Sequence, residues 1–262
     1  MAGFSTYLAQ AILNHSLRGV AYTPPAGTYL ALAVADITDN NVTSNEVTGA
    51  WYARQQITSW AAPVGSGVST SNSNALAYSA ITDSAVTVTH WGLYDAATSG
   101  NLLASGEFVE SKVGNVNNRF KIAAGEVSLT FDGIFSVHLA QSLINFILRG
   151  QSFTPPSRYL ALYTADPTAS DITANEISAA WYARQALSSW DAPTGTGNST
   201  ANSNAFAFPD TTVATVVVTY WGIKDALTTG NLLYSGALDS NETLNVGDAF
   251  AGQAGDITVA LE

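Results

Sequence analysis

Three histidines are the side chains of this chain best suited to proton transfer or metal binding near neutral pH. They are His15, His90 and His138. The chain repeats itself, and the residues that align with them in the other copy are Phe146, Tyr220 and Tyr7. A Ser-His-Asp arrangement or a histidine metal site would therefore exist in one copy only. An aromatic equivalent fits a packing position better than a catalytic or ligand position.

Charged residues that recur in both copies are few, and they form the next candidate set. They are Asp36/Asp166, Glu46/Glu176, Arg54/Arg184, Asp95/Asp225, Arg18/Arg149 and the acid pair Glu126/Asp256. A glycoside hydrolase needs two carboxyl groups roughly 5–10 Å apart on a cleft, and no acid pair stands out here. We interpret Arg54, Arg184, Asp95 and Asp225 as structural residues that hold strand ends, because an unpaired buried charge is costly. We expect no catalytic residue and no cofactor.

Two loop patterns superficially suggest ligand sites. The acidic stretch 36–46 suggests calcium, but it lacks glycine at the sixth position and Glu46 falls one residue short of the twelfth. The loops 62–70 and 192–200 resemble a phosphate cradle but lack the lysine of a P-loop. We expect no metal site of these kinds, although a calcium loop of another type stays open, and we read the glycine loops as exposed connections.

All six tryptophans occur as matched pairs: Trp51/Trp181, Trp60/Trp190 and Trp91/Trp221. Trp91 and Trp221 lie within strand-like segments, so we interpret them as core residues. Trp60 and Trp190 stand at a strand end before a loop. They are candidate partner contacts, and an exposed pair would form a platform for sugars.

The repeat that pairs these residues covers the chain almost end to end. The segment 4–131 returns as 135–261, with an offset of 131 residues that becomes 130 after a one-residue deletion near Ser157. This period exceeds the roughly 20–50 residues of solenoid units. We therefore predict two tandem homologous domains, residues 1–132 and 133–262, each large enough to bury a core without help.

Each copy begins with a helix signal and continues as short strands. Ser5 and Ser136 are N-cap candidates, and apolar residues at helical spacing run to a terminal Arg-Gly, which predicts helices over 5–18 and 136–149. Strands are expected over 29–35, 50–57, 86–94, 101–107 and 126–131, with a glycine-containing hairpin turn at 98–100. The predicted fold is mainly β: two small antiparallel barrels or sandwiches, each preceded by one amphipathic helix. The short junction 130–134 predicts a fixed spacing and an elongated shape.

Composition narrows the class of protein. The chain has no cysteine, a formal charge of −11 and only 11% charged residues. The acidic balance argues against nucleic-acid binding, and no leader or membrane-spanning segment is evident. The polar, weakly charged composition favours a protein that packs in an assembly, and the lack of cysteine favours folding in a reducing cytoplasm.

Several motifs resemble a known family. They include Tyr159-Leu160-Ala161-Leu162, Tyr182-Ala183-Arg184-Gln185, Trp221-Gly222-Ile223-Lys224-Asp225-Ala226 and Gly230-Asn231-Leu232-Leu233. These runs resemble virion structural proteins of tailed bacteriophages, often labelled tail-fibre or structural proteins. The resemblance covers both copies and implies a location in the virion and no catalytic residues.

Three functions follow as hypotheses. The favoured one is a cement or decoration protein that bridges neighbouring major capsid subunits, or binds another virion protein, with self-association about a two-fold axis also considered. Joining two weak footprints can raise avidity by roughly 10²–10⁴. The alternative is a tail or head fibre component that binds host glycans through Trp60 and Trp190. A cell-wall hydrolase is disfavoured by the unmatched histidines.

Overall fold

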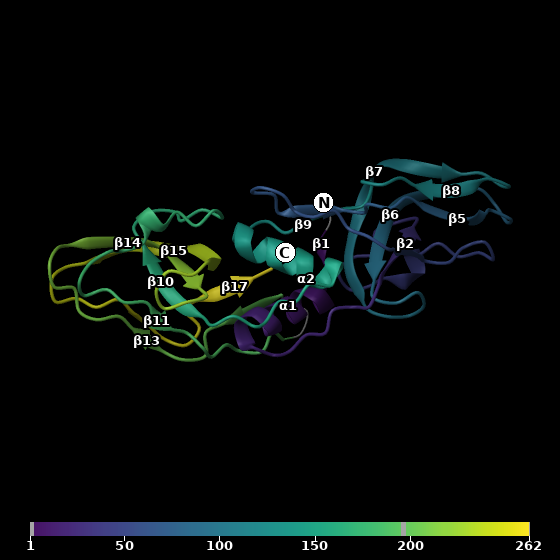
Figure 1. Cartoon of the computed structure of the whole chain (residues 1–262). Helices are drawn as coiled ribbons and strands as arrows, with labels where there is room; N and C mark the ends of the chain where they lie inside the picture. The colour runs from purple at the N-terminus through teal and green to yellow at the C-terminus, as the bar shows by residue number, and fades with distance from the viewer. Residues whose placement is uncertain (1–2, 195–197, 262) are drawn as a thin grey trace.

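The computed structural model describes residues 3–194 and 198–261. The chain is mainly β, with two α-helices and a repeated order of elements (Figure 1). The elements of the first half, residues 3–130, are β1 (Gly3–Phe4), α1 (Thr6–Arg18), β2 (Thr28–Ala33), η1 (Thr43–Asn45), β3 (Gln55–Ile57), β4 (Ser69–Ser71), β5 (Leu76–Ala80), β6 (Val86–Tyr94), β7 (Leu102–Gly114), β8 (Arg119–Ile122) and β9 (Ser128–Thr130).

The second half, residues 134–261, repeats this order, and some of its strands are shorter. Its elements are α2 (Val137–Arg149), β10 (Tyr159–Tyr163), η2 (Thr173–Asn175), β11 (Gln185–Ala186), β12 (Ser199–Ala201), β13 (Phe206–Ala207), β14 (Val216–Lys224), β15 (Leu232–Leu244), β16 (Ala251–Gly252) and β17 (Thr258–Ala260). A single bridge between Phe135 and Tyr234 takes the place of the β1–β7 pair.

Each half has one larger antiparallel sheet and two small ones. The larger sheets have the orders β1-β7-β6-β2-β3 and β11-β10-β14-β15, and the small sheets pair β4 with β9, β5 with β8, β12 with β17 and β13 with β16. The sheets stack as separate antiparallel sandwiches, and in residues 3–194 and 198–261 they do not close into a barrel. The predicted mainly β fold with one helix before each copy is confirmed, in its sandwich form.

The helix termini follow the predicted capping. The hydroxyl of Ser5 accepts a hydrogen bond from the Leu8 N–H, and Ser136 does the same for Leu139, both at 3.1 Å. Gly19 and Gly150 end the helices with φ of 70° and 69°, in the left-handed conformation that glycine adopts without strain. The predicted helices are therefore confirmed to within one residue.

The hydrophobic core does not divide into two. One cluster of buried residues runs from Phe4 and Leu8 through Phe131 and Phe135 to Leu261, and it includes apolar faces of both helices. The expectation that each copy buries its own core is wrong, because each helix contacts β7 or β15 of its own half and also β12 or β4 of the other half. The boundary at residues 132/133 stays a prediction.

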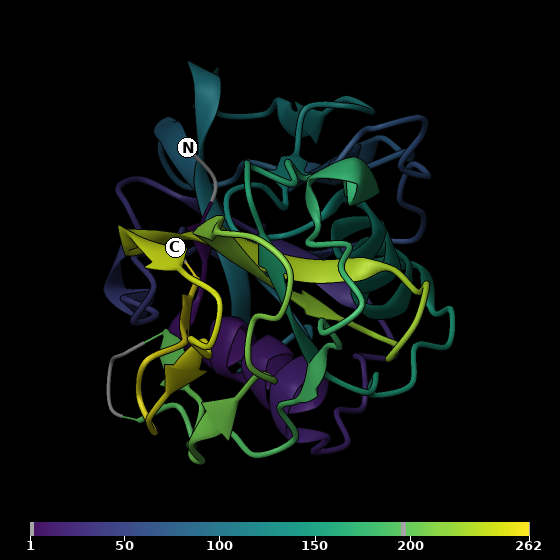
Figure 2. The same cartoon turned by 90° about the vertical axis from the view of Figure 1, so that its left-hand side faces the viewer.

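The two helices therefore occupy the middle of an elongated molecule, with the larger sheets toward opposite ends (Figure 1). In the end-on view of Figure 2, α1 lies beside the green and yellow strands of the C-terminal half, although it comes from the start of the chain. The larger sheet of each half therefore lies at one end of the molecule, away from the helices.

Candidate functional site

Arg54 and Arg184 are the centres of two equivalent polar clusters. Arg54 donates through Nε and Nη2 to the two carboxylate oxygens of Glu46, at 2.8 and 2.7 Å. Arg184 donates in the same way to Glu176, at 2.7 Å for both bonds. Tyr52 also donates its hydroxyl hydrogen to Glu46 at 2.7 Å. The repeated acids Glu46 and Glu176 are thus occupied by internal partners.

The same arginines hold the hairpin turn between β6 and β7, or β14 and β15. Nη1 of Arg54 donates to the carbonyl oxygens of Ala96 and Ser99, and Arg184 donates to Ala226 and Thr229. These four bonds fix the turn relative to the segment before β3 or β11. The sequence placed Arg54 and Arg184 inside strands, whereas they precede β3 and β11 in the structure.

Asp95 and Asp225 close the same turns. Asp95 directly follows β6 and accepts hydrogen bonds from the backbone N–H of Asn101 at 2.7 Å and from its side chain at 2.8 Å. Asp225 binds Asn231 in the same way. Gly100 and Gly230 have φ of 75° and 71°, which confirms the predicted positive φ of this turn.

Burial and neighbouring charges have opposite effects on the pKa of Arg54. Desolvation disfavours the guanidinium of Arg54, but the hydrogen bonds and charge of Glu46 outweigh it and raise the pKa of Arg54. The guanidinium carbon also lies 3.4 Å from the ring centroid of Tyr94. Burial, reinforced by Glu46, raises the pKa of Tyr52 above its ordinary range. Both clusters hold ionised pairs that bind strands together.

The tryptophans lie in the core. Trp91 and Trp221 are 2% and 6% exposed, and Trp60 and Trp190 are 5% and 6% exposed. Nε1 of Trp60 donates to Thr28 Oγ1 and Nε1 of Trp190 donates to the Leu187 carbonyl, both at 2.9 Å. The structure therefore leaves neither Trp60 nor Trp190 as an exposed platform for a sugar or a partner, because their rings fill the core and their donors are satisfied.

The histidines do not meet in one place. His15 is buried and its Nε2 lies 2.9 Å from the Phe153 carbonyl oxygen. His90 lies in β6 next to Thr89, whose Oγ1 is 2.8 Å from its Nδ1. His138 lies in the first turn of α2. Within residues 3–194 and 198–261, no group of three or more His, Asp or Glu side chains is gathered to bind a metal ion.

The described residues of the two loop patterns form hydrogen bonds within the protein. In the acidic stretch, Asp36 accepts from the Thr38 N–H and Glu46 is committed to Arg54. In the loop 62–70, the carbonyls of Gly65 and Gly67 accept from Gln141 of α2. Of the matching loop 192–200, residues 195–197 lie outside the described residues.

The junction between the halves is reciprocal. Nε of Arg18 donates to the Trp190 carbonyl at 3.2 Å, and Nε of the equivalent Arg149 donates to the Trp60 carbonyl at 3.3 Å. Each arginine also bonds an asparagine one turn earlier in its own helix, Asn14 or Asn145. The halves are thus related by an approximate two-fold exchange, with each helix end held by the other half.

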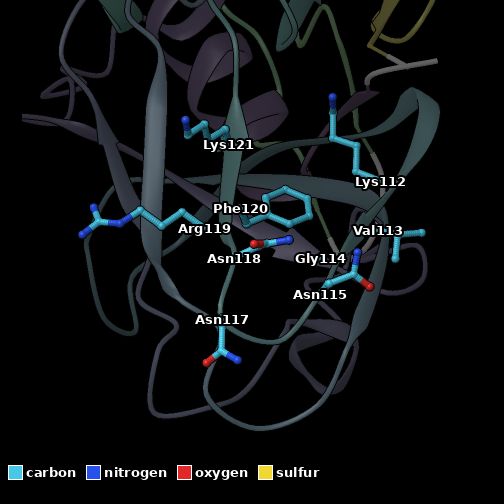
Figure 3. A pocket seen from close by; sticks show the side chains of 9 residues that line it. All are labelled: Lys112, Val113, Gly114, Asn115, Asn117, Asn118, Arg119, Phe120 and Lys121. Carbon is cyan, nitrogen blue, oxygen red and sulfur yellow. The ribbon is translucent and has the colours of Figure 1, made fainter.

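Two grooves, one in each half, share part of their lining positions. The first groove is a cavity of about 710 Å³ between the ends of β7 and β8, lined by residues 112–115 and 117–121 (Figure 3). Its charged side chains are Lys112, Arg119 and Lys121. The second groove, of about 640 Å³, follows β15 and β16, and its charged side chains are Asp239, Glu242 and Asp256. The two grooves share aligned positions but carry opposite charge.

Comparison with known proteins places this fold in a family. Residues 3–130 and again 134–260 match the family described as podophage GP4 fiber I protein gp80. The chain therefore belongs to this family of phage virion structural proteins, as two tandem copies. No curated protein matches the chain. Among the described residues, neither helix is long and apolar enough to cross a membrane.

Sequence reasoning missed two kinds of residue. Asn72 and Asn202 are buried and each bonds three backbone groups, among them Val127 and Ala123 for Asn72. Their repeated Asn-Ser-Asn context was a signal for such a role. The opposite charges of Lys112 and Glu242 were also visible in the aligned copies, but only the structure shows that these residues line grooves.

Proposed function

We propose that this chain is a non-enzymatic structural component of a phage fibre, acting as a rigid connector with two outward ends. The family match supports a virion structural protein, and its description favours the fibre over the capsid-cement role that the sequence favoured. The observation that carries the connector role is the reciprocal junction of Arg18 and Arg149. A shared core resists bending between the halves, so a load on one end is transmitted to the other.

The repeated charges support a non-catalytic role. The acids and bases that recur in both halves are used to bind strands and turns, as with Arg54, Glu46 and Asp95. Such a protein would bind its partners through surface contacts and would not catalyse a reaction. Its partners would then be other virion proteins at its two ends.

Labelling of intact virions tests the location. Fab fragments raised against the purified chain should decorate the fibres of the phage that encodes it, in negative-stain micrographs. Decoration of the head lattice instead would overturn the fibre role and favour bridging of capsid subunits. A Fab against the major capsid protein serves as the positive control for the head.

A further inference from the structure

The nine basic residues of this acidic chain divide into two groups. Six are used inside the protein: Arg54, Arg184 and Lys224 pair with acids, while Arg18, Arg149 and Arg158 bond backbone carbonyls. The remaining three, Lys112, Arg119 and Lys121, all line the first groove. Lys112 forms a partly exposed ion pair with Glu126, whereas Arg119 and Lys121 form no ion pair among the described residues, so the unpaired cations of the described chain lie in this groove.

Arg119 and Lys121 lie on the exposed face of β8. They alternate with buried Phe120 and Ile122 along the strand, so both side chains project outward. Figure 3 shows Lys112 across the groove from Arg119 and Lys121, with the Phe120 ring between them. Among the described residues neither Arg119 nor Lys121 forms an ion pair. The acids of β7, Glu107 and Glu110, lie outside the lining of the groove.

The second groove carries the opposite charge, and one aligned position is itself reversed. Lys112 aligns with Glu242, while Arg119 and Lys121 align with Ala249 and Ala251. The first groove has three lining cations and no lining acid, and the second has three lining acids and no lining cation. The aromatic floor is unchanged, since Phe120 aligns with Phe250 and both line their grooves.

One internal ion pair shows what the reversal costs the second half. In the first half, Lys112 Nζ lies 2.9 Å from Glu126 Oε1, and Glu126 also accepts from the Ala123 N–H. In the second half Asp256 accepts from the Gln253 N–H in the same way, but Glu242 aligns with the lysine. Among the described residues neither Glu242 nor Asp256 forms an ion pair, so the second half lacks this internal cation and its carboxylates can accept one from outside.

We propose that the first groove of one molecule binds the second groove of another copy of this chain. The cations that line the first groove and the acids that line the second make this pairing attractive, while first-to-first and second-to-second pairings bring like charges together. Because the paired surfaces differ, the contact is heterologous and adds molecules head to tail, into a ring or an open chain rather than an isologous dimer. This inference rests on the proposed fibre role for its biological meaning, and it can be tested in solution without the virion.

Sedimentation velocity of the full chain at high concentration tests the contact. We expect concentration-dependent species larger than the monomer in low salt, with association falling at least about tenfold at high salt because the groove charges are exposed to solvent. The double variant Arg119→Ala/Lys121→Ala, which copies the second half, should lose association. Its control, Asn40→Asp/Gln56→Glu, changes the net charge equally at exposed positions outside both grooves and should behave as wild type.

A charge swap gives the decisive result. Arg119→Glu/Lys121→Glu makes both grooves of a molecule acidic, and Asp239→Lys/Glu242→Lys makes both basic. Each variant alone should stay monomeric, and their equimolar mixture should assemble. A wild-type chain that is monomeric in low salt, or a mixture that fails to assemble while both variants remain folded by circular dichroism, overturns the proposal.

Heparin-binding measurements distinguish the binding of a second copy from the binding of an anionic polysaccharide at the first groove. Salt-sensitive heparin binding that the Arg119→Ala/Lys121→Ala variant abolishes, in a wild-type chain that does not self-associate, would assign the first groove to a polysaccharide. That outcome would reject the second copy as the occupant but leave the fibre role intact. Fab decoration of the head would instead reject the fibre role without affecting the solution result.

Discussion

The imidazole ring of His15 stacks on the ring of Phe146, with centroids 4.9 Å apart and planes inclined by 16°. These two residues occupy the same position in the two copies, so the stack marks the approximate two-fold axis of the junction. Phe153, the aligned equivalent of Tyr22, packs against both rings. The centre of the molecule is therefore an aromatic contact between two copies of one helix.

Removing the His15 ring should destabilise the aromatic contact between the two helices. His15→Ala should lower the free energy of unfolding by about 2–4 kcal/mol, since it leaves a cavity and an unpaired carbonyl at Phe153. His15→Phe keeps the stack and should cost about 1–3 kcal/mol, because it loses the hydrogen bonds to the Phe153 carbonyl and from the Tyr22 N–H. Urea unfolding followed by tryptophan fluorescence measures both, with Val64→Ala, at a side chain that is 77% exposed, as the neutral control. A phenylalanine variant less stable than the alanine variant would contradict the role of the stack.

Removing one partner of the Arg54–Glu46 pair should strongly lower the free energy of unfolding. Arg54→Met leaves Glu46 largely buried without its partner and should cost about 3–5 kcal/mol. The double variant Arg54→Met/Glu46→Leu should cost clearly less than the sum of the single changes. Lys112→Met is the matched control, because that pair is 28% and 33% exposed and its loss should cost about 0–1 kcal/mol. Equal costs for the two single variants would show that the burial of Arg54 has no energetic consequence.

The shared core predicts a single unfolding transition. Differential scanning calorimetry of the full chain should give one cooperative peak in which the calorimetric and van't Hoff enthalpies agree. Arg18→Met/Arg149→Met removes both reciprocal bonds at the junction, at about 1.5–3 kcal/mol each, and should lower the midpoint. Two resolved transitions in the wild-type chain would mean that the halves unfold independently.

The pKa of Glu126 should depend on its ion pair with Lys112. Burial opposes its charged form, but the hydrogen bond to Lys112 prevails and holds the pKa of Glu126 below its ordinary value. Its contribution to stability is thus present above the ordinary glutamate pKa and is lost as pH falls through the lowered pKa of the folded state. In NMR titrations, Lys112→Met should raise the pKa of Glu126. An unchanged pKa would assign the shift to the Ala123 N–H alone.

The sequence predicted the elements better than their arrangement. Both helices, the long strand β6 and the β6–β7 hairpin follow from capping serines, a run of β-branched and aromatic residues, and the turn at Gly100. The strands β4 and β8 were missed because Ser69–Ser71 and Arg119–Ile122 are short and polar at alternate positions. A period-two signal over three or four residues is too weak to distinguish a strand from a loop.

The exchange of helices between the halves could not be read from the sequence. The apolar stripe of α1 would suit the strands of either half, because the two copies repeat the same strand motifs, such as Tyr-Leu-Ala-Leu at 29–32 and 159–162. The partner of Arg54 was equally hidden, since nothing in the spacing separates Glu46 from the other acids. Burial of Trp60 was left open because a ring at a strand end before a loop can lie inside or outside the core; in the structure its Nε1 bonds Thr28, and Arg149 of the other half holds its backbone carbonyl.

The reciprocal hold of Arg149 on Trp60 affects how the protein is made. When translation reaches Thr130, every strand of the first half has been synthesised, yet the helix that packs against β4 has not. At about 5–20 residues per second, β12 and β17 follow only several seconds later. The nascent first half therefore waits with an uncovered apolar face, so slow elongation after residue 130 should lower the yield of native protein.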